Sequence, residues 1–226
     1  MSFNLDELSD FEASGTVVLK STGNNGSGAG PGVATSTLSD PTVESPNQLR
    51  VVTSINEAGF AVYRHNIIGA SFDLASMGPI TSISFSMDVR EPSAAAADAP
   101  IYLGFSQDGV DYLYTTNTGT NADIFEFRNA DNSTFVNIAA IGMTENQFGS
   151  YPGQIVNEVD QTSQPDLSAA GAEIQFAIYT FSGSNGSSTR QTDFRNAELT
   201  VNYVPEPSVA LFLLGGLSVL GFARRR

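Results

Sequence analysis

The chain of 226 residues has no cysteine, no tryptophan, one histidine and one lysine. The absence of cysteine excludes disulfides, thiolate zinc sites and cysteine nucleophiles. A Ser-His-Asp triad would have to use His65, yet the sequence contains neither a Gly-x-Ser-x-Gly elbow nor a Gly-x-x-x-x-Gly-Lys loop for phosphates. We therefore interpret His65 as an ordinary residue at a strand end.

Basic residues are scarce as well, and the formal net charge is -14. Three of the ten bases, Arg224, Arg225 and Arg226, lie at the extreme C-terminus, so the rest of the chain is more acidic still. An acidic surface repels phosphate backbones and anionic headgroups. Nucleic acid is therefore excluded as a partner, and divalent cations or neutral glycans fit better.

The remaining composition predicts a folded all-β protein. Apolar residues make up 41% of the chain, with 15 Phe and 7 Tyr, which is enough for a sizeable core. Apolar and polar residues alternate with period two in Ile83–Val89, Ala197–Tyr203 and, less regularly, Ile174–Ile178. This pattern is typical of half-buried antiparallel strands.

Shorter windows of the same kind add to the expected strands. They are Thr16–Lys20, Leu49–Ser54, Phe60–Arg64, Ile101–Phe105, Tyr112–Thr116, Ile124–Arg128 and Phe135–Ala139. We predict one antiparallel two-sheet sandwich over residues 1–203, of the jelly-roll or concanavalin-like type.

Several segments between these windows have the composition of connections. Asn24–Gly32 and Pro92–Pro100 are predicted surface loops. Asp108–Asp111 and Asn129–Asn132 are predicted hairpin turns, with ion sites as the alternative. A short helix is expected within Gly142–Gly153.

The last 23 residues differ from the rest of the chain. Val209–Ala223 is uncharged over 15 residues, with Ser218 as its one polar side chain, so it has no hydrophilic face. A helix of this length spans roughly 23 Å, a marginal length for a hydrocarbon core of roughly 30 Å. The arginines that follow favour a short transmembrane helix with its C-terminus in the cytoplasm and the acidic body outside. A short apolar helix buried in protein is the alternative.

The order of parts in this tail resembles a known sorting signal. Val204, Pro205, Glu206, Pro207 and Ser208 precede the apolar segment, and Arg224, Arg225 and Arg226 end the chain. Residues 204–226 are similar in this to the PEP-CTERM signal of Gram-negative bacteria that produce extracellular polysaccharide. The resemblance implies recognition near Pro205–Pro207 by an exosortase, a membrane-embedded cysteine protease or transpeptidase. The chain would be its substrate.

An exported protein also needs an N-terminal signal, and the start of this chain does not look like one. Residues 1–14 are acidic and have neither a basic region nor an apolar run. Removal of a signal, a start assigned too far downstream, or a lack of export are the three explanations. We expect one of the first two.

Candidate binding residues in the body are few. Asp10 and Glu12 near the start, with Asp193 before the last strand, resemble the strand ends of carbohydrate-binding jelly rolls where structural calcium often sits. Solvated turn acids are the alternative for these three residues. The exposed rings needed for glycan stacking would come from tyrosines that alternatively pack in the core, namely Tyr112, Tyr114, Tyr151 and Tyr179.

These observations lead to one leading hypothesis and two alternatives. We expect a non-enzymatic protein of the cell surface or extracellular matrix, anchored in the inner membrane as a precursor and associated with exopolysaccharide. The alternatives are a carbohydrate-binding module with structural calcium and a glycan hydrolase, for which a carboxylate pair would suffice. The Glu-x-Asp-x-x-Glu strand of concanavalin-like hydrolases is absent, which argues against catalysis.

Overall fold

The computed structural model describes residues 1–21, 34–40, 48–90, 100–116, 122–128, 134–151, 158–184 and 186–205. Sheet 1 consists of β1 (Ser2–Asn4), β3 (Ala34–Ser39), β4 (Leu49–Ile55), β6 (Ile80–Arg90), β10 (Val136–Met143) and β14 (Ser188–Tyr203). Sheet 2 consists of β2 (Thr16–Ser21), β5 (Gly59–Phe72), β7 (Ile101–Gln107), β8 (Val110–Tyr114), β11 (Phe148–Tyr151) and β13 (Ile174–Ser184). The smaller elements are β9 (Ala122–Asp123), β12 (Glu158–Val159), α1 (Leu74–Met77) and the 3-10 turns η1 (Leu8–Asp10) and η2 (Glu145–Gln147).

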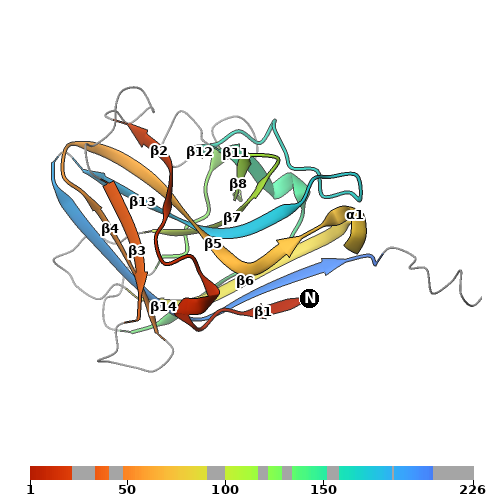
Figure 1. Cartoon of the computed structure of the whole chain (residues 1–226), viewed down its shortest axis with the longest axis horizontal. Helices are drawn as coiled ribbons and strands as arrows, with labels where there is room; N and C mark the ends of the chain where they lie inside the picture. Colours follow the sequence, from red (N-terminus) through yellow and green to blue (C-terminus); the bar gives the residue numbers. More distant parts are fainter. Residues whose placement is uncertain are drawn as a thin grey trace, which may run out of the picture.

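The two sheets are antiparallel and face each other as a sandwich (Figure 1). Sheet 1 has the order β10-β6-β14-β4-β3, with β1 paired to β14, and sheet 2 has the order β11-β8-β7-β13-β5-β2. β9 and β12 form a separate pair. The prediction of an all-β, two-sheet antiparallel sandwich is confirmed.

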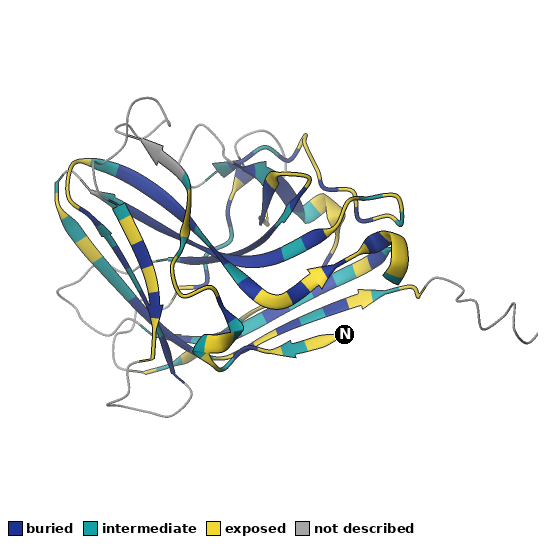
Figure 2. Cartoon of the chain, in the orientation of Figure 1, coloured by how far each residue is buried: buried dark blue, intermediate teal, exposed yellow. Residues whose placement is uncertain are grey.

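Period-two alternation places the core between the sheets. In β6, Ile83, Phe85, Met87 and Val89 are completely buried, while the serines between them point outward. The matching inner residues of β13 include Phe176. Figure 2 shows the resulting alternation of buried and more exposed residues along the strands.

The N-terminal residues belong to the sandwich. Residues of β1 pair with β14, and the amino group of Met1 donates to the carbonyl of Val201 at 2.8 Å. Residues 11–15, called the strap here, then connect the two sheets. Phe11 pairs with Ile67 of β5, and Ser14 pairs with Thr37 of β3.

Most expected strands exist, although several differ in length. Ile124–Arg128 was wrong as a strand, because in it only Ile124 and Phe127 form isolated bridges. The expected helix within Gly142–Gly153 is reduced to η2. The turn at Asp108–Asp111 is confirmed, with positive φ at Asp108 and Gly109 as a type I′ hairpin requires.

Other expectations fall on residues outside the described part. These are the loop Asn24–Gly32, all of Pro92–Pro100 except its last residue, the whole turn Asn129–Asn132, and the apolar segment Val209–Ala223. Within the described ranges, no helix is long and apolar enough to cross a membrane.

Candidate functional site

The outer faces of the two sheets differ in character. The outer face of sheet 1 presents short polar side chains such as Ser84 and Thr200. The outer face of sheet 2 instead carries a second hydrophobic cluster, whose aromatic members are Tyr102, Tyr151, Tyr179 and Phe181. Val159 of β12 packs over this face, close to Gly149 of β11. This aromatic face is the candidate site.

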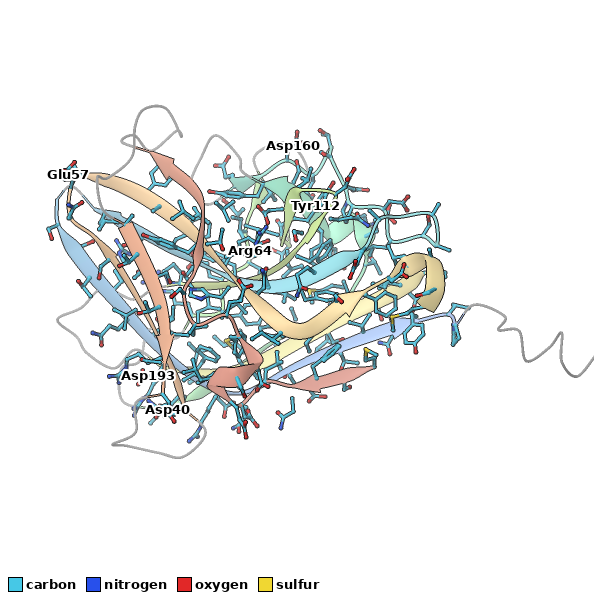
Figure 3. The ribbon with its side chains drawn as sticks, in the orientation of Figure 1. Asp40, Glu57, Arg64, Tyr112, Asp160 and Asp193 are labelled. Atoms are coloured by element: carbon cyan, nitrogen blue, oxygen red, sulfur yellow. The ribbon has the colours of Figure 1, made fainter. Side chains whose placement is uncertain are left out.

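Three polar side chains converge on the aromatic face from three strands. Arg64 of β5 donates from Nη1 to Asp111 Oδ1 of β8 at 2.7 Å. Tyr179 of β13 donates from Oη to the same oxygen at 2.6 Å. The side chain of Arg64 is 23% exposed and that of Asp111 is 10% exposed, so solvent reaches both charged groups. Figure 3 shows Arg64 above the central strands of sheet 2.

Small residues beneath the ring of Tyr179 allow its hydroxyl to reach Asp111. The ring packs directly against Gly104 of β7. A Cβ at Gly104 would lie 2.7 Å from Tyr179 Cε2 and 2.4 Å from the carbonyl oxygen of Tyr112. Ala177, the neighbour of Gly104 in β13, is also small. The glycine therefore leaves the space in which the tyrosine ring lies.

Hydrogen-bonding groups remain open around the ion pair. Arg64 Nε and Tyr151 Oη are buried atoms with no hydrogen-bond partner among the described residues. Tyr151 lies directly opposite Asp111 in the β11–β8 ladder. Unsatisfied buried donors are rare and costly, and one explanation is a ligand or water that completes them.

The charge states at this site are fixed by burial and by the ion pair. Burial, with the negative charge of Asp111 nearby, raises the pKa of Tyr179 well above its usual value. The same two causes raise the pKa of Tyr151. Although burial alone would lower it, the hydrogen bond to Asp111 raises the pKa of Arg64. The site thus offers neutral phenols beside a fully charged guanidinium and its carboxylate.

The predicted calcium ligands are not brought together. Both oxygens of the completely buried Asp193 carboxylate accept hydrogen bonds from Arg50, at 2.6 and 3.0 Å, and Oδ2 also accepts from Arg90 and Gln48. Arg50 and Arg90 are the cross-strand neighbours of Asp193 on either side, so the row Arg50–Asp193–Arg90 is an ion cluster.

The other two predicted ligands have separate partners. Asp10 accepts from the backbone of Glu7 in the capping box of η1, and Glu12 accepts from Asn66. The described residues contain no group of three acidic, histidine or cysteine side chains suited to a metal ion.

The four tyrosines considered for sugar stacking are all buried. Tyr112 and Tyr114 belong to the core between the sheets, and Tyr151 and Tyr179 belong to the outer cluster of sheet 2. The alternative that they pack in or beside the core is therefore correct. The sequence places Arg64 at the end of a predicted strand and Asp111 at the end of a predicted turn, but it does not predict their ion pair, because 47 positions separate them and neither belongs to a motif.

The expectation that His65 lies at a strand end was wrong. His65 lies inside β5 and is completely buried. Its Nδ1 lies 2.9 Å from the carbonyl of Glu12, and its Nε2 lies 2.8 Å from Ser36 Oγ. Since a carbonyl only accepts, Nδ1 carries the proton and Nε2 accepts from Ser36. The imidazole connects the strap to β3 and is a structural residue.

The sorting residues are only partly described. Val204 and Pro205 follow β14, and the backbone of Val204 donates to Pro79 at 3.0 Å. Glu206, Pro207 and Ser208, together with Arg224, Arg225 and Arg226, lie outside the described residues.

Comparisons with known proteins give no family. No family model matches the chain, and no curated protein matches it. Solved structures to which the chain shows some similarity include a family 11 carbohydrate-binding module from Clostridium thermocellum in complex with a β-1,3-1,4-mixed-linked tetrasaccharide. It is 12% identical, with a TM-score of 0.42 over 86% of this chain and 99% of that one. The xyloglucanase domain of an effector from Sinorhizobium fredii is 12% identical, with a TM-score of 0.32 over 89% of this chain and 97% of that one. At such low scores the likeness supplies neither a function nor site residues.

Proposed function

We propose that this chain is a non-enzymatic protein of the bacterial surface whose jelly-roll-like body binds a neutral carbohydrate on the outer face of sheet 2. The observation that carries the proposal is the partly exposed ion pair of Arg64 and Asp111, set beside the buried rings of Tyr151 and Tyr179.

The chemistry of the ion pair suits sugar hydroxyls. Arg64 Nη1 and Tyr179 Oη both donate to Asp111 Oδ1, and Oδ2 accepts no hydrogen bond from the described residues. Two adjacent hydroxyls of a sugar can donate to this oxygen and accept from the solvent-exposed part of the Arg64 guanidinium at the same time. A neutral polysaccharide is favoured over an anionic one because the molecule carries a net charge of -14.

A glycan array of the full chain in mild detergent tests the proposal. We expect binding to neutral polysaccharides that is reduced about tenfold or more by Arg64→Gln, since an open donor and the partner of Asp111 are both removed. Arg195→Gln is the matched control, because Arg195 also pairs with an aspartate, Asp88, but on sheet 1.

Three results would reject parts of this proposal. If no glycan is bound, the carbohydrate function is wrong. If Arg64→Gln and Arg195→Gln weaken binding equally, the site is misplaced. If sugar is released from the bound glycans, the chain is an enzyme.

The tail supplies the proposed location. The resemblance of residues 204–226 to a PEP-CTERM signal implies that Val209–Ala223 is a temporary transmembrane helix and that an exosortase acts near Pro205–Pro207. The body would then reach the cell surface or the matrix, where polysaccharide is the abundant partner.

A further inference from the structure

The free edge of sheet 1 at β10 differs from other edges of the sandwich. At the edge formed by β3, the strap pairs with the strand, with Gly15 N donating to Ser36 O at 2.9 Å and Leu38 N donating to Ala13 O at 2.7 Å. At the edge formed by β11, Ser150 and Asp160 exchange two backbone hydrogen bonds. β10 pairs with β6 on one side, and no other described strand pairs with it.

Edge strands usually carry features that prevent pairing with another chain, such as charged side chains or proline. β10 has the sequence Val-Asn-Ile-Ala-Ala-Ile-Gly-Met, which contains neither. A register shift between Ala140 and Met143, with Gly142 at φ 68°, ends the regular ladder. Val136–Ala140 remains in continuous register, so about half of its backbone N–H and C=O groups point outward.

Apolar side chains are exposed along this edge. Ile141 is 74% exposed, the highest value among the large hydrophobic residues of the described part, and Val136 is 43% exposed. Asn137 and Ala139 point to the outer face, because Ile138 and Ala140 lie opposite the buried Met87 and Phe85. Val136 lies opposite the buried Val89 and so belongs to the inner face, at the exposed end of the strand. An open backbone ladder beside exposed apolar side chains is suited to strand addition.

We propose that β10 pairs with β10 of a second copy of this chain, antiparallel about a two-fold axis, so that the two first sheets become continuous. The strand itself favours this occupant, because a strand that completes an open ladder must have an open ladder of its own, and β10 has one among the described strands. Two molecules of net charge -14 repel each other over most of their surfaces, and the uncharged β10 is a part of the surface where they can meet. Asp88, the acid opposite Asn137, is held by Arg195, Asn137 and Asn196. A two-fold antiparallel contact is self-complementary, as closed dimers require.

The absence of native cysteine makes this pairing directly testable. Single variants Asn137→Cys, Ala139→Cys and Ile141→Cys of the full chain in mild detergent are oxidised gently. If the two-fold axis passes through one of these outward positions, that position meets its own copy. If it passes through Ile138 or Ala140, neighbouring outward positions meet each other, so equimolar mixtures of the variants are oxidised as well. A disulfide needs Cβ atoms about 4 Å apart, and we expect at least one variant or mixture to form a disulfide-linked dimer about tenfold faster than Thr35→Cys. Thr35 is an exposed outward residue of β3, whose edge the strap covers.

Sedimentation of the unoxidised protein provides the second measurement. An edge interface below about 1,200 Å² is weak, so the concentration series extends to about 1 mM. We expect the wild-type chain to dimerise and Ala139→Lys to weaken the dimer about tenfold, because it sets like charges across the axis. Thr35→Lys, which changes the net charge equally, should leave the dimer intact.

The outcomes are distinct. A wild-type chain that stays monomeric over the whole series overturns the proposal. Association that Ala139→Lys and Thr35→Lys affect equally, as association through the apolar tail or through the glycan face would be, also overturns it. Cysteine variants that crosslink no faster than Thr35→Cys exclude β10 as the contact even if Ala139→Lys fails to fold. None of these results depends on carbohydrate binding.

Discussion

At the scale of single residues, Gly104 has the clearest structural requirement. Its position under the ring of Tyr179 needs the absence of a Cβ, not an unusual backbone angle, since the nearest atoms would lie at 2.4 to 2.7 Å. One of these atoms is the carbonyl oxygen of Tyr112, and backbone moves less readily than a flexible side chain. The neighbouring strands would have to shift to accept any larger residue.

We therefore expect Gly104→Ala to lower the free energy of unfolding by about 1–3 kcal/mol through overpacking. Urea unfolding followed by tyrosine fluorescence measures this. Gly186→Ala is the matched control, because a Cβ at Gly186 meets no atom within 4 Å. Equal stability of both variants would show that the sheet relaxes around position 104.

Asp193 is the second residue with a measurable role. Its carboxylate is completely buried between Arg50 and Arg90, so Asp193→Asn removes a buried negative charge that binds both guanidinium groups. We expect a loss of about 3–5 kcal/mol in the free energy of unfolding. Asp88→Asn should cost about 1 kcal/mol or less, because the Asp88–Arg195 pair is more exposed. Similar losses for both variants would contradict a special role for the cluster.

At the scale of elements, the sequence predicts strands well where apolar and polar residues alternate. Ile83–Val89 and Ala197–Tyr203 lie in β6 and β14 for this reason. β3 was missed, because its Ser and Thr residues give little hydrophobic contrast. β5 was predicted too short, because Ile67–Ala70 bulges out between the residues paired with Ala177 and Gln175, which interrupts the alternation.

The candidate site was much harder to predict than the strands. Burial of Tyr151 and Tyr179 depends on the cluster outside sheet 2, which no local pattern reveals. An acidic residue such as Asp193 suits calcium. Its environment is set instead by two arginines that are distant in the sequence and adjacent in the sheet. Pairing across strands is the information that a single sequence does not contain.

The strap is an element whose stability should depend on pH. His65 connects the strap to β3, and Glu12 is the charged group that faces it. Burial lowers the pKa of His65 in the folded protein below the 6.5 of an exposed histidine, despite the opposing effect of Glu12. The unfolded chain therefore binds a proton first as the pH falls. Stability that is present above about pH 6.5 is then lost at up to about 1.4 kcal/mol per pH unit.

Comparison of wild type with His65→Gln isolates this effect from the other titrating groups. The free energy of unfolding, measured in urea from pH 8 to pH 5, should favour wild type most at high pH. The difference between the two proteins should shrink below about pH 6.5. A difference that is constant over the whole range would mean that His65 is not held neutral by the fold.

At the scale of the whole molecule, an acidic sandwich is followed by a tail for which we propose a sorting role. The full chain, with a secretion signal supplied and expressed in a host with the matching exosortase, should be cleaved near Pro205–Ser208. Mass spectrometry of the released body should then show that the apolar segment is missing. Replacing Pro205, Glu206 and Pro207 with alanine should leave membrane insertion intact, because the apolar segment and the arginines drive it, and should block cleavage.

The variant distinguishes a sorting signal from a simple anchor. Precursor of the alanine variant should accumulate in the membrane. Processing of the variant at the same place and rate would show that residues 205–207 are not recognised, and Val209–Ala223 would then be only a short hydrophobic anchor.

The central claim is that the outer face of sheet 2 binds carbohydrate, and hydrogen exchange tests it most directly. The full chain is compared with and without the neutral glycan that it binds best on the array. We predict slower exchange in β5, β8, β11 and β13, whose residues surround Arg64 and Asp111, with little change in sheet 1. Protection confined to sheet 1, or no protection at saturating glycan, would contradict the account.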